Sequence, residues 1–272
     1  MVENVSKDGL ITRRSSVQIW LPQPHQHPPF FSEGIFLIAN KPRDRAQAVL
    51  SKEERRSPLP KTEDIMTDKE LKVERYREEN KTALAGQVVF TGSSLMEMFP
   101  INKLLREHGE DVTIYNRGVG GFLSDELLAV IDVCATDLAP SKVFINIGTN
   151  GLSWSDIPIS RLMENYDRII TTIEHTVPGV KIYLMAYYPV NYEAASEEMK
   201  ECLKIRTNEK ITAANAEVKA LAQRHGQRYI DINRALKDEQ GRLKAEYTIE
   251  GLHINEDGYR AVYDDIMRYV KE

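Results

Sequence analysis

A chain of 272 residues, 42% hydrophobic and 28% charged, has enough apolar material for the core of a globular protein. Its formal net charge of −5 gives no electrostatic reason to expect nucleic acid or an anionic membrane as a partner. A small neutral or polar substrate fits at least as well. The two cysteines lie in helix-like segments, and the longest apolar run near the amino terminus, 34–39, is too short for a signal peptide or a membrane span. We therefore expect a cytoplasmic protein without a disulfide framework or stable membrane insertion, and leave open whether it forms a homo-oligomer.

The first segment, 1–61, contains seven of the twelve prolines and shows no sustained helix or strand period. This composition predicts a loosely ordered extension. His25 and His27 form a His-x-His pair that could bind a metal ion, but two histidines without further ligands are more often simply solvated. We expect no metal site here.

The second predicted segment, a domain over 62–272, begins with a strong helix start. Thr67 and Glu70 have the spacing of a capping box, Met66 and Leu71 occupy the positions of a hydrophobic staple, and the charged run "DKELKVERYREENK" follows.

Short strand-like runs then alternate with helix-length segments to the carboxyl end of the chain. The predicted strands are 87–92, 112–118, 142–148, 181–190 and 228–233. Between the last two lies a long helical stretch that Ser196 could begin and Gly226 end, and Asn255 is the expected cap of the final helix. Strands joined by helical crossovers predict an α/β fold of three α/β/α layers around a five-stranded parallel sheet.

Residues suited to chemistry follow these strands, where an open parallel sheet binds its ligands. The first strand runs into "GSSL" (92–95), the second into the glycine-rich "GVGG" (118–121), and the third into "GTNG" (148–151). Beyond the fifth strand, "EGLHINEDGY" contains Glu250 and His253. Each stretch alone is usually only a turn or a cap. Together they supply a serine nucleophile, a general base, an orienting acid and oxyanion donors, the set that acyl transfer requires.

These four stretches resemble the sequence blocks of the SGNH hydrolase family, the GDSL esterases and lipases, over roughly 84–272. The likeness extends to its platelet-activating-factor acetylhydrolase-like and lysophospholipase-like branch. The resemblance implies a flavodoxin-like sheet and a catalytic triad of Ser94, His253 and Glu250. It places the oxyanion hole at the Ser94 amide, the Gly121 amide and the Asn150 side chain.

Two positions depart from the family pattern. Ser93 stands where the family usually has aspartate, but none of the expected oxyanion donors is lost. Glu250 replaces the usual aspartate of the triad and adds one methylene, and glutamate serves as the acid in other serine hydrolases. A Gly-x-Ser-x-Gly elbow is absent because Met96 occupies its last position, which argues against the α/β-hydrolase fold.

The sequence therefore predicts a serine esterase that cleaves small acyl esters without a cofactor or metal. Two alternatives stay open: a catalytically weak domain that binds an acylated sugar or lipid, and an acyltransferase with the same triad. Phe122, Trp154 and Tyr188 follow strand ends and could line a substrate pocket, although packing against helices is the expected role.

Overall fold

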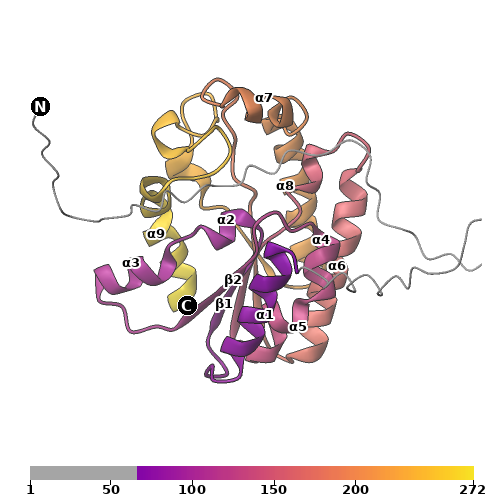
Figure 1. Cartoon of the computed structure of the whole chain (residues 1–272), viewed down its shortest axis with the longest axis vertical. Coiled ribbons are helices and arrows are strands. Elements are labelled where there is room, and N and C mark those ends of the chain that lie inside the picture. The colour runs from indigo at the N-terminus through magenta and orange to yellow at the C-terminus, as the bar shows by residue number, and fades with distance from the viewer. Residues whose placement is uncertain (1–65) are drawn as a thin grey trace, which may run out of the picture.

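The computed structural model describes residues 66–272 (Figure 1). The predicted extension, its two histidines and the proposed domain boundary lie outside the described residues. No helix in 66–272 is long and apolar enough to cross a membrane.

A five-stranded sheet forms the centre of the fold. Its strand order is β2-β1-β3-β4-β5, and every neighbouring pair is parallel. This confirms the predicted flavodoxin-like α/β/α class. In chain order the elements are α1 (Asp68–Asn80), β1 (Val88–Gly92), α2 (Ser94–Glu97), α3 (Ile101–His108), β2 (Ile114–Gly118), α4 (Ser124–Ala129), α5 (Ile131–Cys134), β3 (Lys142–Asn146), α6 (Ile159–Thr176), β4 (Lys181–Met185), α7 (Glu197–Leu203), α8 (Asn208–Arg224), β5 (Arg228–Ile230) and α9 (Glu256–Lys271), with short 3-10 turns between some of them.

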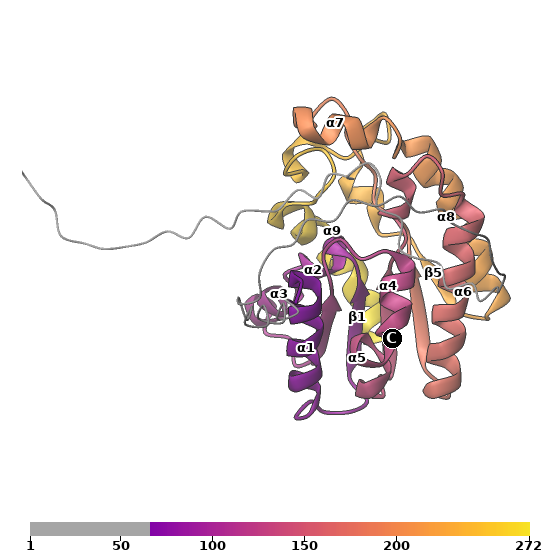
Figure 2. The same cartoon turned by 45° about the vertical axis from the view of Figure 1, so that its right-hand side comes forward.

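Helices cover both faces of this sheet. One face packs against α1, α4, α5, α6 and α8, and the other against α3 and α9 (Figures 1 and 2). Successive strand residues point to opposite faces, so Val89 joins the first core and Phe90 the second. In the second core Phe144 stacks on Tyr183 with ring centroids 4.5 Å apart. The strands are buried on both sides, as their continuous apolar runs predicted.

The start of α1 is the capping box that the sequence predicted. The Glu70 N–H donates to Thr67 Oγ1 at 3.3 Å, and the Thr67 N–H donates to Glu70 Oε2 at 2.7 Å. The staple is not formed as a buried contact, because Met66 and Leu71 are 40% and 54% exposed. Asn255 caps α9 as expected, by accepting the Gly258 N–H.

Several predictions about element bounds were wrong. The third and fifth strands end two and three residues earlier than predicted, at Asn146 and Ile230. The long helical stretch after Ser196 is two helices, because Thr207 begins α8 with its own cap and accepts the Lys210 N–H at 3.3 Å. The fourth strand ends at Met185 rather than at 190. Residues 186–190 are buried, but burial in a loop has the same apolar signature as burial in a strand.

Candidate active site

The two adjacent serines after β1 have different surroundings. Ser93 is 1% exposed, its N–H donates to the Asn146 carbonyl, and its hydroxyl has no hydrogen-bond partner among the described residues. Ser94 is the first residue of α2 and is only partly buried. The sharp strand-to-helix turn thus turns Ser93 inward and leaves Ser94 at the carboxyl edge of the sheet.

A hydrogen-bonded chain connects Ser94 with the turn before α9. His253 Nε2 lies 3.0 Å from Ser94 Oγ, and His253 Nδ1 lies 2.5 Å from Glu250 Oε1. The same carboxylate oxygen accepts the His253 backbone N–H at 3.2 Å. The extra methylene of glutamate therefore does not prevent contact with the imidazole. The structure brings together the three side chains that the sequence singled out.

The turn that carries Glu250 and His253 is held from several sides. Thr248 Oγ1 accepts the Gly251 N–H at 2.8 Å and donates to the His253 carbonyl at 3.0 Å. The Asn191 N–H donates to the Gly251 carbonyl at 2.7 Å. The imidazole consequently sits on a fixed backbone, as a general base requires.

A buried cation lies in the surroundings of Glu250. Arg206, between α7 and α8, is 2% exposed, and its Nε has no hydrogen-bond partner among the described residues. Burial lowers the pKa of Arg206 to about 10, against the opposing influence of Cys202, Tyr187 and Glu250. Glu250 therefore interacts electrostatically with Arg206 as well as with the imidazole, and no sequence motif indicated this residue.

Candidate oxyanion donors lie beside Ser94. A Cβ added to Gly120 would lie 3.9 Å from the Ser94 Cβ, so the glycine-rich loop passes directly by the serine. Within 66–272, the backbone N–H groups of Ser94 and Gly121 make no hydrogen bond. The Asn150 side chain donates to the Phe122 carbonyl at 3.0 Å, which ties it to the same loop. All three predicted donor groups are thus carried by segments that meet at this edge.

A further tyrosine supports the serine turn, and sequence reasoning did not assign it a role. Tyr259 of α9 is 1% exposed, and its hydroxyl donates to the Leu95 carbonyl at 2.8 Å. Its place in "EDGY", close to His253, was the available signal. Of the aromatic residues considered for a pocket, Phe122 and Tyr188 are 4% and 1% exposed, which agrees with the expected packing role.

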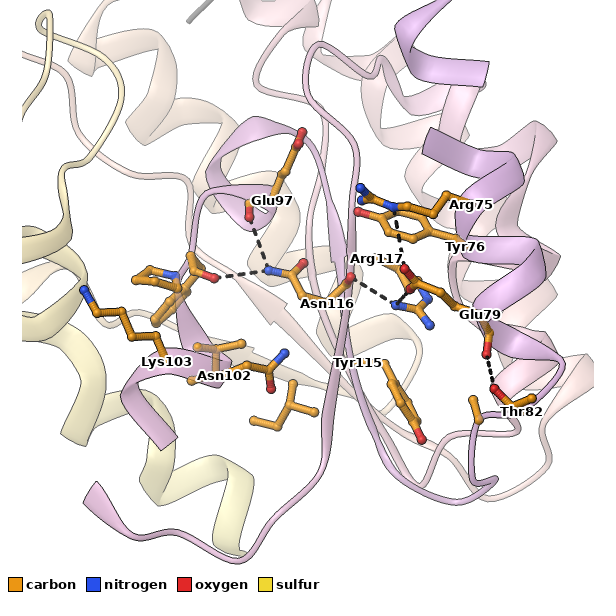
Figure 3. Close-up of a pocket in the computed structure, with 15 residues that line it drawn as sticks. Arg75, Tyr76, Glu79, Thr82, Glu97, Asn102, Lys103, Tyr115, Asn116 and Arg117 are labelled. Carbon is orange, nitrogen blue, oxygen red and sulfur yellow. Dashed lines mark hydrogen bonds and ion pairs between the residues drawn. The ribbon is translucent and has the colours of Figure 1, made fainter. Parts of the chain in front are cut away.

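A groove of about 660 Å³ lies elsewhere, along the outer edge of β2 (Figure 3). Its walls include Tyr76 of α1, Glu97 of α2 and Arg117 of β2. Neither Ser94 nor His253 lines it. Glu97 and Tyr76 are groove residues that also contact the glycine-rich loop.

Comparison with known proteins identifies the family of this chain. The model of the GDSL-like lipase/acylhydrolase family matches residues 100–261, more than half of the chain. The chain belongs to this family. The match begins after Ser94, so the serine turn and α1 lie outside the matched segment.

Solved structures of similar fold include members of the GDSL-like family. One, from Streptococcus pneumonia and provisionally assigned as a platelet activating factor, is 32% identical with a TM-score of 0.67, covering 74% of this chain and 92% of its own. A GDSL-like lipase from Bacteroides thetaiotaomicron is 21% identical with a TM-score of 0.61, covering 73% and 97%. An acetylxylan esterase from Geobacillus stearothermophilus is 15% identical with a TM-score of 0.54, covering 70% and 96%. The last two show the fold alone.

Two curated proteins match over shorter parts of their length. An N-acylneuraminate cytidylyltransferase of Escherichia coli is 25% identical over 71% of this chain and 42% of its own. The rice GDSL esterase/lipase WDL1 is 24% identical over 57% of this chain and 64% of its own. The chain therefore spans less than two thirds of either curated relative.

Proposed function

We propose that this protein is a serine esterase that hydrolyses small acyl esters with Ser94 as nucleophile. The observation that carries the proposal is the continuous chain from Glu250 Oε1 through both imidazole nitrogens of His253 to Ser94 Oγ, with distances of 2.5 and 3.0 Å. A nucleophile, a base and an orienting acid in this order are the working parts of a catalytic triad.

In the acylation step, Ser94 Oγ forms a bond to the ester carbonyl carbon and its proton passes to His253 Nε2. The imidazolium is stabilised by Glu250. As the tetrahedral intermediate collapses, the ester C–O bond breaks and the proton on Nε2 passes to the leaving alcohol. Water then repeats the sequence on the acyl-enzyme, with His253 as base, and releases the carboxylic acid.

The Ser94 and Gly121 amides and the Asn150 side chain are the proposed oxyanion hole. Both amides are unbonded in the described structure, and preorganised donors of this kind supply much of the rate enhancement in acyl transfer. Loss of one donor typically costs ~100- to 1000-fold in turnover. Asn150→Ala should fall in this range.

The substrate class is a short acyl ester. Phe122 and Tyr188 are buried in packing, which leaves them unable to line a long acyl tunnel without rearrangement, whereas Trp154 is partly exposed. Acetyl esters, including acetylated sugars, carry the smallest common acyl group and are therefore the first compounds to assay for this acylhydrolase family member.

The decisive experiment compares Ser94→Ala with Ser93→Ala on a short-chain aryl acetate. Ser94→Ala should abolish turnover and labelling by a fluorophosphonate, while Ser93→Ala should retain both. Turnover that survives Ser94→Ala would refute the proposed nucleophile. An intact protein without turnover or labelling would instead favour the non-catalytic binding domain, and acyl transfer to an added alcohol would favour the transferase.

A further inference from the structure

One face of α1 follows the glycine-rich loop between β2 and α4. Lys69, Lys72 and Tyr76 are spaced i, i+3 and i+7, which places them on the same side of the helix. Lys69 Nζ donates to the Gly121 carbonyl at 2.9 Å, and the Tyr76 hydroxyl donates to the Gly118 carbonyl at 2.8 Å. Thus α1 contacts the loop directly at both ends.

Lys72 reaches the middle of the loop through Glu97. Its ammonium pairs with Glu97 Oε1, and Glu97 Oε2 accepts the Gly120 N–H at 2.5 Å. Glu97 lies on α2, one helical turn after Ser94, and Figure 3 shows it at the top of the groove across from Tyr76. The carboxylate is therefore a bridge between α1, the serine turn and the loop.

These contacts bracket the Gly121 amide. The Gly121 N–H belongs to the peptide group between Gly120 and Gly121. Glu97 holds the preceding peptide group through the Gly120 N–H, and Lys69 holds the following one through the Gly121 carbonyl. A glycine pair has little conformational preference of its own, so the direction of the Gly121 N–H must be set from outside. Gly121 has φ +76°, and a Cβ there would lie 3.3 Å from Lys69 Cε. A Cβ on Gly120 would lie 2.8 Å from Glu97 Oε2.

The two ion pairs are partly exposed, so we expect them to contribute modestly to global stability. The side chains are 27% and 36% exposed in Lys69–Glu126, and 25% and 29% exposed in Lys72–Glu97. Ion pairs near the surface contribute little to the free energy of unfolding. Their effect should therefore appear in the geometry of the loop.

We propose that α1 is a brace for the oxyanion hole, in which Lys69 and Lys72 are positioning residues that act through the glycine-rich loop. This inference rests on the proposed function, because it assumes that the Gly121 amide stabilises the oxyanion. The brace lies in 68–80, outside the segment that the family model matches.

The test uses Lys69→Met, Lys72→Met and the double variant, with Lys81→Met as the matched control. Lys81, which follows α1, is 62% exposed, and among residues 66–272 its ammonium pairs with Glu78 alone. We expect each single variant to lower kcat for an aryl acetate by about 10-fold and the double variant by about 100-fold, since small misplacements of catalytic groups have effects of this size. KM and the melting temperature should stay near those of the control.

A second measurement separates positioning from general loosening. A trifluoromethyl ketone forms a tetrahedral adduct with an oxyanion, so its inhibition constant should weaken in proportion to kcat/KM across the series. Glu97→Gln, which keeps a carbonyl oxygen for the Gly120 N–H, should retain more activity than Glu97→Leu.

The results also distinguish the brace from the triad, because Ser94→Ala is measured alongside. A double variant with kcat within twofold of wild type, beside an inactive Ser94→Ala, would overturn the brace and leave the esterase proposal intact. A kcat loss matched by Lys81→Met, or an unchanged inhibition constant for the ketone, would also overturn it. Activity retained in Ser94→Ala would refute the proposed function itself.

Discussion

Two histidines of this molecule, His253 and His225, both bind carboxylates yet have different neighbours on their second nitrogen. His253 has Glu250 on Nδ1 and the Ser94 hydroxyl on Nε2. His225, at the end of α8, has Glu174 on Nδ1 at 2.9 Å and Asp167 on Nε2 at 3.0 Å.

The second partner decides what the ring can do. An ionised carboxylate only accepts, so two of them favour the form of His225 in which both nitrogens carry a proton. A hydroxyl can donate, so Nε2 of His253 can keep the lone pair that a general base needs. The difference teaches that a carboxylate beside histidine does not by itself indicate catalysis.

The largest expected effect in this comparison is at His253. His253→Asn should lower kcat for an aryl acetate by ~10⁴-fold or more, because the base that receives the Ser94 proton is removed. His225→Gln should leave kcat within twofold. Steady-state kinetics on both variants measure these effects. A comparable loss of kcat in His225→Gln would contradict the assignment of catalysis to His253 alone of the two histidines.

The next effect concerns the acid. Glu250→Gln should reduce kcat by as much as ~10⁴-fold, because an amide holds the imidazole less well and can favour the wrong tautomer. Glu250→Asp restores the charge and the usual family residue, and should be the more active of the two. Equal kcat in the Glu250→Gln variant and the wild type would show that the carboxylate is not needed.

A smaller effect is expected on stability, at His225. Loss of its two charged hydrogen bonds should lower the free energy of unfolding by about 1 to 3 kcal/mol at mildly acidic pH. Urea denaturation of His225→Gln measures this. His175→Gln, at an exposed position at the end of the same α6 that carries Asp167 and Glu174, is the control and should unfold like wild type.

The smallest expected effect is the pH dependence of the stability lost in His225→Gln. Burial alone would lower the pKa of His225, but its hydrogen bonds to Asp167 and Glu174 raise the pKa above the usual value. The folded state thus binds the proton more tightly than the unfolded state. The stabilisation is fully present below the unfolded pKa, near 6.5, and disappears as the pH rises through the folded pKa. The cost of His225→Gln should accordingly be larger at about pH 5.5 than at about pH 9; the opposite trend would contradict a protonated His225.

Much of the fold was readable from local patterns. The capping box at Thr67, the cap at Asn255 and the five apolar strand runs are each specified within a few residues, so they predicted the observed elements and the parallel sheet. The break between α7 and α8 was missed because a helical period continues across it. Its only local signal is Thr207, one of several residues there that could cap a helix.

The candidate site divides in the same way. The sequence by itself determined which residue types follow each strand. Because the carboxyl ends of parallel strands meet at one edge of the sheet, it also predicted that these residues lie close together. Strand-end position pointed to the serine pair, the glycine-rich loop, Asn150, Glu250 and His253, and the resemblance to the family blocks selected Ser94 and Gly121 among them. Only the tertiary structure decided that the longer Glu250 reaches His253. It also decided that the buried Arg206 lies close enough to Glu250 for their charges to interact. The contact of Lys69 with the glycine-rich loop, and that of Lys72 with Glu97 beside it, likewise come from the tertiary structure. These contacts join residues from separate elements, and their distances depend on how helices pack on the sheet, which no local pattern in the chain encodes.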